Sequence, residues 1–206
     1  MRVVVVTGGI GSGKSYVCRY LSARYGWPVY EADARVKELY QEHPTLLNDI
    51  EQALGVSVRN PDGSLASKLL ADVIFKDPQA LACVEGLVFP VLSEDFRQWK
   101  QGYEDCPFVL LESATILEKP QLKDMGDVVV LIDAPVHVRA ARASVRDGVS
   151  DDAVRQRMGS QQLMNDISSG VVRCPADFCI LNDKTPAELD KKLDILVENI
   201  GKQKCY

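Results

Sequence analysis

The chain has 206 residues, of which 46% are hydrophobic and 26% are charged, a composition typical of a soluble globular protein with a buried core. Its 24 Lys and Arg residues against 29 Asp and Glu residues give a net charge of −5, which excludes a protein that coats nucleic acid or anionic membranes through charge alone. No apolar run reaches the roughly 18 residues of a membrane span, and residues 1–6 meet a Gly-rich turn too early for a signal peptide. We therefore expect a cytoplasmic protein with no nucleic-acid or membrane partner and no obligate protein partner.

Strand and helix patterns alternate from the start of the chain. Residues 3–7 form a β-branched run that stops at glycine, which is typical of a strand buried on both faces. A helical pattern follows until residues 26–28, where Gly and Pro end it, and residues 29–30 predict a short second strand. Residues 35–105 repeat apolar side chains at helical spacing, interrupted by a turn at residues 60–63. This segment is predicted to be a mostly helical insert.

The second half of the chain returns to alternating strands and helices. Strand patterns lie at residues 108–111, 128–132 and 178–181, and helical patterns lie at 135–146, 151–162 and 186–200. The first two strands are followed by acidic residues, Glu112 and Asp133. Strands that alternate with helices indicate an α/β fold with a parallel sheet covered on both faces. The expected domains are a core of residues 1–34 and 106–206 and the insert of residues 35–105.

The six cysteines do not form a recognisable metal or redox motif. They contain no Cys-x-x-Cys pair, and the two histidines of the chain cannot complete a structural zinc site with them. We expect reduced thiols that fill apolar space, with a redox-active thiol as the less favoured alternative. The cysteines are Cys18, Cys83, Cys106, Cys174, Cys179 and Cys205.

Residues 8–15, Gly-Gly-Ile-Gly-Ser-Gly-Lys-Ser, match the G-x-x-x-x-G-K-[ST] pattern of a phosphate-binding loop between a predicted strand and helix. Glycines let successive backbone N–H groups face phosphate oxygens at the positive end of the helix dipole. Lys14 can bring a cation to the β and γ phosphates, and the Ser15 hydroxyl can ligate magnesium. A flexible turn is the alternative, and the spacing does not fit the Rossmann G-x-G-x-x-G pattern. The expected ligand is a nucleoside triphosphate.

Asp33 follows the second predicted strand, at the edge where α/β sheets bind their ligands. A carboxylate near a phosphate loop can accept the proton of an attacking hydroxyl, which is the general-base role that kinases need. The alternative is that Asp33 is the N-cap of the next helix, and the sequence favours neither interpretation. A GTPase is disfavoured because residues 181–184, Leu-Asn-Asp-Lys, have the letters of a base-reading motif in the wrong order.

Residues 135–159 contain five arginines and no lysine. Arg139, Arg142 and Arg146 fall at positions i, i+3 and i+7, along one face of the predicted helix. Guanidinium groups bind phosphate oxygens through paired hydrogen bonds, so this segment predicts a lid, about residues 139–165, that closes over the transferred phosphate. The alternative is a solvated helix face whose arginines pair with nearby aspartates, Asp147, Asp151 and Asp152. The phosphate loop favours the lid.

Together these motifs resemble the dephospho-coenzyme A kinase family over nearly the whole chain. The phosphate loop, the strand end at residues 28–33 and the insert motif Asp62-Gly63-x-Leu65 are similar to those of the family. Arg142-x-x-x-Arg146, Arg157-x-x-x-Gln161 and the run from residue 176 to Asn182 resemble its lid and last strand. The sequence departs from the family pattern at several positions, namely Tyr16, Glu31, Phe89 and residues 112–118.

The resemblance implies a P-loop kinase core with a helical acceptor-binding insert and an arginine-rich lid. It also implies transfer of the γ-phosphate of ATP to the ribose 3′-hydroxyl of dephospho-CoA, which gives CoA and ADP. The implied catalytic residues are Asp33, Lys14 and Arg142, and Ser15 is the implied Mg2+ ligand. The implied nucleotide-binding residues are Gly9, Gly11, Ser12, Gly13, Lys14, Ser15, Tyr16, Arg146 and Asn182.

Two other functions stay open at this point. One is a different P-loop kinase, acting on a nucleoside monophosphate or another small molecule, although such kinases usually have a shorter acceptor segment than residues 35–105. The other is a nucleotide-dependent binding module that hydrolyses little, which Asp33 and the arginine-rich segment disfavour.

Overall fold

A computed structural model describes residues 1–202 and, within them, every side chain except those of Pro44, Pro120, Lys123 and Ser168. The chain forms two compact units. The sheet unit consists of Met1–Tyr30 and Tyr103–Tyr206, and the helical unit consists of Glu31–Gly102. Within residues 1–202, no helix is both long and apolar enough to cross a membrane.

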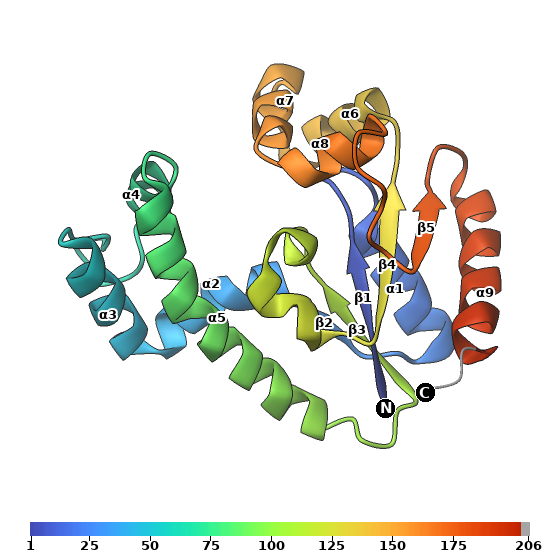
Figure 1. The fold of residues 1–206 in the computed structure, drawn as a ribbon, viewed down its shortest axis with the longest axis horizontal. Coiled ribbons are helices and arrows are strands. Elements are labelled where there is room, and N and C mark those ends of the chain that lie inside the picture. The colour runs from blue at the N-terminus through green and yellow to red at the C-terminus, as the bar shows by residue number, and fades with distance from the viewer. Residues whose placement is uncertain (203–206) are drawn as a thin grey trace. The chain divides into compact units, whose positions relative to one another are not determined.

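The sheet unit is built on five strands in the order β2-β3-β1-β4-β5 (Figure 1). The strands are β1 (Arg2–Thr7), β2 (Val29–Glu31), β3 (Phe108–Glu112), β4 (Val128–Asp133) and β5 (Phe178–Leu181). β1 pairs in parallel with β3 and β4, and β4 pairs in parallel with β5, which confirms the predicted parallel α/β fold. Because these strands run the same way, the carboxyl ends of β1, β3, β4 and β5 lie at one edge of the sheet.

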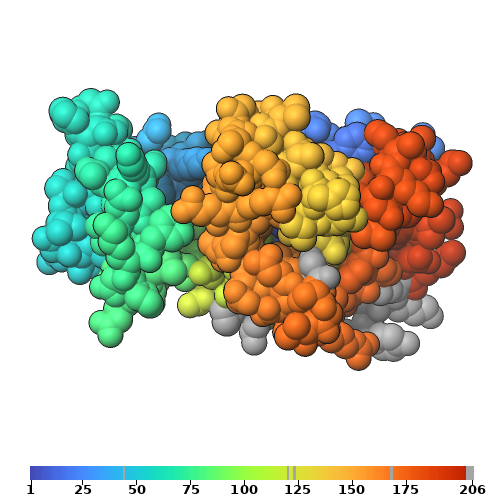
Figure 2. All heavy atoms as spheres, turned by 90° about the horizontal axis from the view of Figure 1, so that it is seen from above, coloured from blue at the N-terminus to red at the C-terminus, as the bar shows by residue number. Residues whose placement is uncertain are grey.

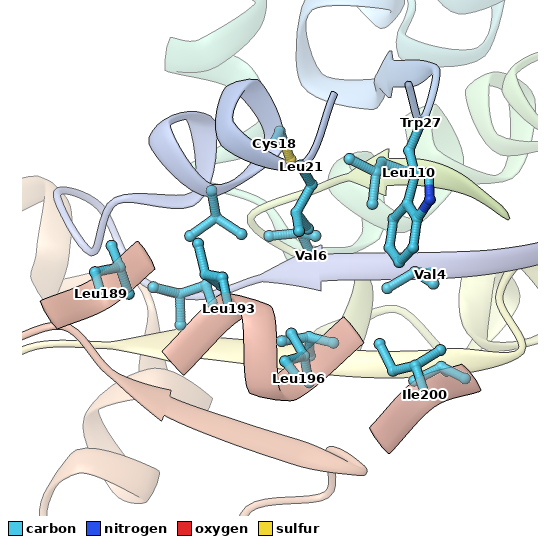
Figure 3. Packing of buried hydrophobic residues seen from close by; sticks show 14 residues of the cluster. Val4, Val6, Cys18, Leu21, Trp27, Leu110, Leu189, Leu193, Leu196 and Ile200 are labelled. Carbon is cyan, nitrogen blue, oxygen red and sulfur yellow. The ribbon is translucent and has the colours of Figure 1, made fainter. Parts of the chain in front are cut away.

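The central strand β1 is buried on both faces of the sheet, as its apolar run predicts. Each of its four consecutive valines, Val3 to Val6, is at most 4% exposed. On one face, Val4 and Val6 pack with Leu21 of α1 and Leu193 of α9 (Figure 3). Burial of each such side chain contributes roughly 1.5–3 kcal/mol relative to exposure, so this core holds the phosphate loop at the end of β1 in place.

The helices of the sheet unit follow its strands in the chain. They are α1 (Lys14–Tyr25), α6 (Val136–Asp147), α7 (Asp151–Gly159), α8 (Gln162–Ser168) and α9 (Pro186–Lys202), with short 3-10 helices at Ile116–Glu118 and Pro120–Met125. α1 ends where predicted, at Gly26, whose φ of 71° lies in the left-handed region that glycine adopts at low cost. α1 and α9 both contribute to the apolar cluster on one face of the sheet.

One predicted helix is interrupted. The pattern over residues 151–162 predicted a single helix, whereas α7 ends at Gly159 and α8 begins at Gln162. Gln161 has φ −91° and ψ 69°, outside the helical region, and its side-chain Oε1 accepts a hydrogen bond of 2.8 Å from the backbone N–H of Ile10. The helix therefore breaks where Gln161 turns to contact the phosphate loop, a long-range contact that helical periodicity does not encode.

The helical unit has its own core. It consists of α2 (Ala32–Glu42), α3 (Pro44–Leu54), α4 (Ser67–Ile74) and α5 (Pro78–Gln101). The predicted turn at residues 60–63 is present, with Gly63 at φ 84° donating its N–H to the Asn60 carbonyl at 2.9 Å. Ile50 is fully buried and Leu47, Val84 and Val88 are nearly so, because α3 and α5 pack their apolar faces together.

The five cysteines within the described residues are free, and Cys205 lies outside those residues. Cys18 is buried in the core of the sheet unit, as expected of a thiol that fills apolar space. The same expectation is wrong for Cys83 and Cys179, which are exposed. The Sγ atoms of Cys174, in the loop before β5, and Cys179, in this edge strand, lie 2.8 Å apart.

Candidate active site

The phosphate loop, residues 8–13, joins the carboxyl end of β1 to α1. Gly8, Gly11 and Gly13 have φ values of 145°, 75° and 105°, which other residues adopt only with strain. A Cβ on Gly13 would also lie 2.4 Å from the Nδ2 atom of Asn182. Because Gly13 is the N-cap of α1 and has no side chain, the first backbone N–H groups of the helix can bind an anion.

Lys14 and Ser15 open α1 directly after the loop. The Lys14 Nζ donates to the carbonyl oxygens of Gly8, at 3.0 Å, and Gly9, at 3.4 Å, so its cation lies against the loop. The Ser15 hydroxyl donates a hydrogen bond of 2.8 Å to Oε1 of Glu112, the buried carboxylate that ends β3. A hydroxyl and a carboxylate therefore meet beside the phosphate loop, and both offer oxygen ligands of the kind that Mg2+ prefers.

Asn182 connects the loop after β5 to two other parts of the site. Its Nδ2 donates to the backbone carbonyl of Ser12 at 2.8 Å. Its backbone carbonyl and its Oδ1 accept from Nη1 and Nη2 of Arg142 at 3.1 Å and 3.4 Å. Since Asn182 is only 7% exposed, these contacts fix the guanidinium plane of Arg142 beside the phosphate loop.

Two adjoining cavities lie beside the phosphate loop and Arg142. They share the lining residues Gly13, Tyr16 and Arg142. The first has a volume of about 230 Å³ and is lined by Gly13, Tyr16, Arg142, Asn182, Lys184, Pro186 and Leu189. The second has a volume of about 180 Å³ and is lined by Gly11, Gly13, Lys14, Ser15, Tyr16, Arg19, Arg142, Ala143 and Arg146. A partly apolar cavity next to a cationic one suits a nucleoside joined to a polyphosphate.

Tyr16 lines both cavities, but its hydroxyl is directed to α9. The hydroxyl donates a hydrogen bond of 2.9 Å to Oδ1 of Asp190. This hydrogen bond to a carboxylate is the main reason why the pKa of Tyr16 is raised. Tyr16 therefore stays neutral and offers its ring, rather than a charge, to a ligand.

Arg146 combines both of the alternatives that the arginine pattern left open. It lines the second cavity, as a lid residue would, and its Nε donates to Oδ1 of Asp147 at 2.7 Å, as on a solvated face. Asp147 also pairs with Arg157 of α7, and these two arginines hold its pKa well below the ordinary range. α6 and α7 contact each other, and this yellow-to-orange segment forms an exposed face in Figure 2.

Asp33 lies in the first turn of α2, within the helical unit. The helix begins one residue before it, and its N-cap is Glu31, so the interpretation of Asp33 as the N-cap is wrong. The β2 strand extends one residue beyond the predicted residues 29–30, to Glu31, and the helix starts at the next residue. The phosphate loop belongs to the sheet unit, and the catalytic role of Asp33 stays a prediction.

A family model for dephospho-CoA kinase matches residues 2–188. The chain belongs to the dephospho-CoA kinase family. A dephospho-CoA kinase from Porphyromonas gingivalis is 36% identical over 182 residues, covering 88% of this chain and 86% of the relative. Another, from Thermobifida fusca, is 32% identical over 203 residues, covering 98% of both chains. A crystal structure of a protein from Thermus thermophilus superposes with a TM-score of 0.80 at 25% identity, covering 98% of both chains. These comparisons confirm the resemblance that the motifs predicted.

For this member of the dephospho-CoA kinase family, sequence reasoning did not place two of the residues that contact the loop. Glu112 was noted as an acid at a strand end and as part of the segment 112–118 that departs from the family pattern, but not as a partner of Ser15, although an acid at the ligand-binding edge of a parallel sheet is a signal for a site residue. Gln161 was assigned to a helix and to the lid motif Arg157-x-x-x-Gln161, and its contact with the loop was not predicted. The structure brings both next to residues 10–15 through the sheet order and the break between α7 and α8.

Proposed function

We propose that this chain transfers the γ-phosphate of ATP to the ribose 3′-hydroxyl of dephospho-CoA, which gives CoA and ADP in the last step of coenzyme A biosynthesis. The observation that carries this proposal is a glycine-rich phosphate loop beside two adjoining cavities in a member of the dephospho-CoA kinase family. The fold alone would allow other acceptors, since P-loop kinases share this sheet. The family match supports dephospho-CoA as the acceptor.

The two cavities divide the nucleotide between them. The nucleoside occupies the first cavity, where the Arg142 guanidinium, oriented by Asn182, offers a flat cation to the face of the purine. The triphosphate occupies the second, where the N–H groups at the start of α1, Lys14 and Arg146 surround it. Because Arg142 lines both cavities, it contacts the nucleotide at the junction of base and phosphates.

Lys14 changes partners when the nucleotide binds. In the structure its Nζ lies on the Gly8 and Gly9 carbonyls, at the rim of the loop that cradles phosphate. A short swing of this flexible side chain brings the cation to the β and γ phosphate oxygens. There it stabilises the negative charge that the transferring group carries, in a site whose other donors are already oriented.

Ser15 and Glu112 are the residues that would hold Mg2+. Their oxygens are 2.8 Å apart, and Mg2+ usually takes one or two protein oxygens together with phosphate and water. Among the described residues no group of three or more His, Cys, Asp and Glu side chains could hold a metal by itself. Bound Mg2+ would neutralise charge on the β and γ phosphates.

In this proposal the helical unit binds the acceptor and Asp33 activates it. Asp33 takes the proton of the attacking 3′-hydroxyl, and α2 to α5 supply the acceptor-binding surface. The proton passes from the hydroxyl oxygen to the carboxylate as the oxygen bonds to the γ-phosphorus and the bond to the β–γ bridging oxygen breaks. Arg142 and Arg146, with the segment of residues 139–165, close over the transferred group.

The purified chain tests this proposal directly, because the reaction as proposed needs no membrane or partner protein. A coupled assay should detect ADP formation that depends on both Mg2+ and dephospho-CoA. Nucleoside monophosphates and shikimate, offered as alternative acceptors, should give no more ADP than ATP alone. Turnover of another acceptor in preference to dephospho-CoA would replace this proposal with the other small-molecule kinase, and ATP binding without turnover would favour a binding module.

A further inference from the structure

Arg139 of α6, which the lid prediction grouped with Arg142 and Arg146, is a buried cation at the phosphate loop, and the proposed reaction gives it no role of its own. Its side chain is among the largest fully buried side chains, with 1% exposure. None of its three guanidinium nitrogens has a hydrogen-bond partner within the part of the chain that the structure describes. Burial of a charge without partners opposes folding, so a residue of this kind calls for an explanation.

The guanidinium lies directly against the loop backbone. A Cβ on Gly9 would be 1.8 Å from Nη1 and 2.8 Å from Cζ of Arg139. A Cβ on Gly11 would be 2.1 Å from the Arg139 carbonyl oxygen. A side chain at Gly9 would therefore have to displace the Arg139 guanidinium, and at Gly11 the Arg139 carbonyl adds a steric reason for glycine to the positive φ of 75°.

Asp133 acts on Arg139 through its charge, but the Arg139 guanidinium has no hydrogen-bond partner among the described residues. Burial lowers its pKa, and Asp133 at the end of β4 opposes that effect, but an arginine keeps its proton in proteins. The adjacent carbonyl oxygens of Gly8 and Gly9 accept from Lys14 instead. The loop therefore has two cations beside it, Arg139 from α6 and Lys14 from α1.

We propose that Arg139 is a positioning residue for polyphosphate, whose fixed buried charge is compensated when the phosphates of the nucleotide bind in the loop. It acts through the backbone of Gly9 to Gly11, since its guanidinium contacts the loop. This inference rests on the proposed function only in taking a nucleoside polyphosphate as the ligand of the loop. It implies that Arg139 destabilises the empty protein and stabilises the complex.

A purely structural role makes the opposite prediction. If Arg139 only fills space behind Gly9, a side chain of similar length without charge should preserve nucleotide affinity, and any damage should show as a lower melting temperature. If Arg139 positions polyphosphate, loss of its charge should weaken ligands in proportion to their phosphate charge. Removal of an unpaired buried charge should also leave the empty protein as stable as before, or more stable.

Three variants separate these roles: Arg139→Met removes the charge, Arg139→Gln retains hydrogen-bond donors and Arg139→Lys retains the charge. Calorimetry at low salt should measure binding of ADP, AMP and inorganic tripolyphosphate, and thermal melts should be run without ligand. We expect Arg139→Met to bind ADP and tripolyphosphate roughly tenfold or more weakly, as for loss of a charged partner. AMP binding should change less, the melting temperature should not fall, and Lys should restore more affinity than Gln.

Arg173→Met, at an exposed arginine outside the cavities, is the matched control and should change none of these values. If Arg139→Met fails to fold, the comparison of Arg139→Lys with Arg139→Gln still measures the effect of charge. Wild-type affinity for ADP and tripolyphosphate in the uncharged variants would overturn this inference and leave the proposed function intact. A wild-type protein that binds neither ligand would overturn both.

Discussion

The phosphate loop and α6 bring cations to the same cavity in different ways. In the loop, residues 8–15 are consecutive, and the backbone N–H groups and Lys14 act because of local conformation. In α6, three arginines share a helix but not an environment: Arg139 is buried against Gly9, Arg142 bonds to Asn182, and Arg146 pairs with Asp147. The difference shows that residue spacing locates an arginine on a helix, whereas its partners from other elements decide its role.

The largest effect on activity is expected in the phosphate loop. Lys14→Ala should lower kcat by about 10²–10³-fold, because solvent does not replace an oriented charge at the transferring phosphate. Steady-state kinetics with a thermal melt should show this loss at an unchanged melting temperature. Lys202→Ala, which removes an exposed lysine of α9, is the control and should retain full activity. Near wild-type kcat/KM in Lys14→Ala would remove the loop lysine from the mechanism.

Asp33→Asn tests the helical unit in the same assay. Loss of a general base should lower kcat on the order of a hundredfold or more. Because Asp33 is in the first turn of α2 and is not its N-cap, the change should cost little stability, roughly the 0.3–1 kcal/mol of one helix-dipole interaction. Asp105→Asn, which changes an exposed carboxylate outside the proposed acceptor-binding helices, is the control and should retain full activity. A normal kcat in Asp33→Asn would contradict the general-base role.

Most of the fold could be predicted from the sequence, but only part of the site could be. Apolar runs that stop at glycine or at an acid predicted the strands, because these residues mark the ends of strands in a parallel sheet. The helix break at Gln161 and the burial of Arg139 could not be predicted, because each depends on a partner more than a hundred residues away in the chain. The contact of Ser15 with Glu112 likewise follows from β1 and β3 being neighbours in the sheet.

In α6, substitutions of the two arginines that line the cavities should have different kinetic effects. Arg142→Lys should raise the KM for ATP by roughly tenfold with a smaller change in kcat, because lysine loses the flat guanidinium and its paired bonds to Asn182. Arg146→Lys should instead lower mainly kcat. Of the two cavities, Arg146 lines only the second, where we place the triphosphate. Full activity in both variants would favour the solvated-face interpretation of α6.

The smallest effect concerns the ion pairs of Asp147. Arg146 and Arg157 lower the pKa of Asp147 from its ordinary 3.8, so the stabilisation is present above that pH and is lost as the pH falls through the lowered pKa. Asp147→Asn should therefore lower the melting temperature at neutral pH, by at most about 3 °C for exposed pairs. The difference from wild type should shrink as the pH is lowered below 3.8. A difference that does not vary with pH would show that these ion pairs do not contribute.

The identity of the phosphorylated product tests the central claim most directly. The purified chain should be incubated with ATP, Mg2+ and dephospho-CoA, and the product analysed by mass spectrometry and phosphorus NMR. The account predicts a product heavier than dephospho-CoA by one phosphoryl group, attached at the ribose 3′-oxygen and formed in equal amount with ADP. Unchanged dephospho-CoA, or a phosphoryl group at any other position, would contradict it.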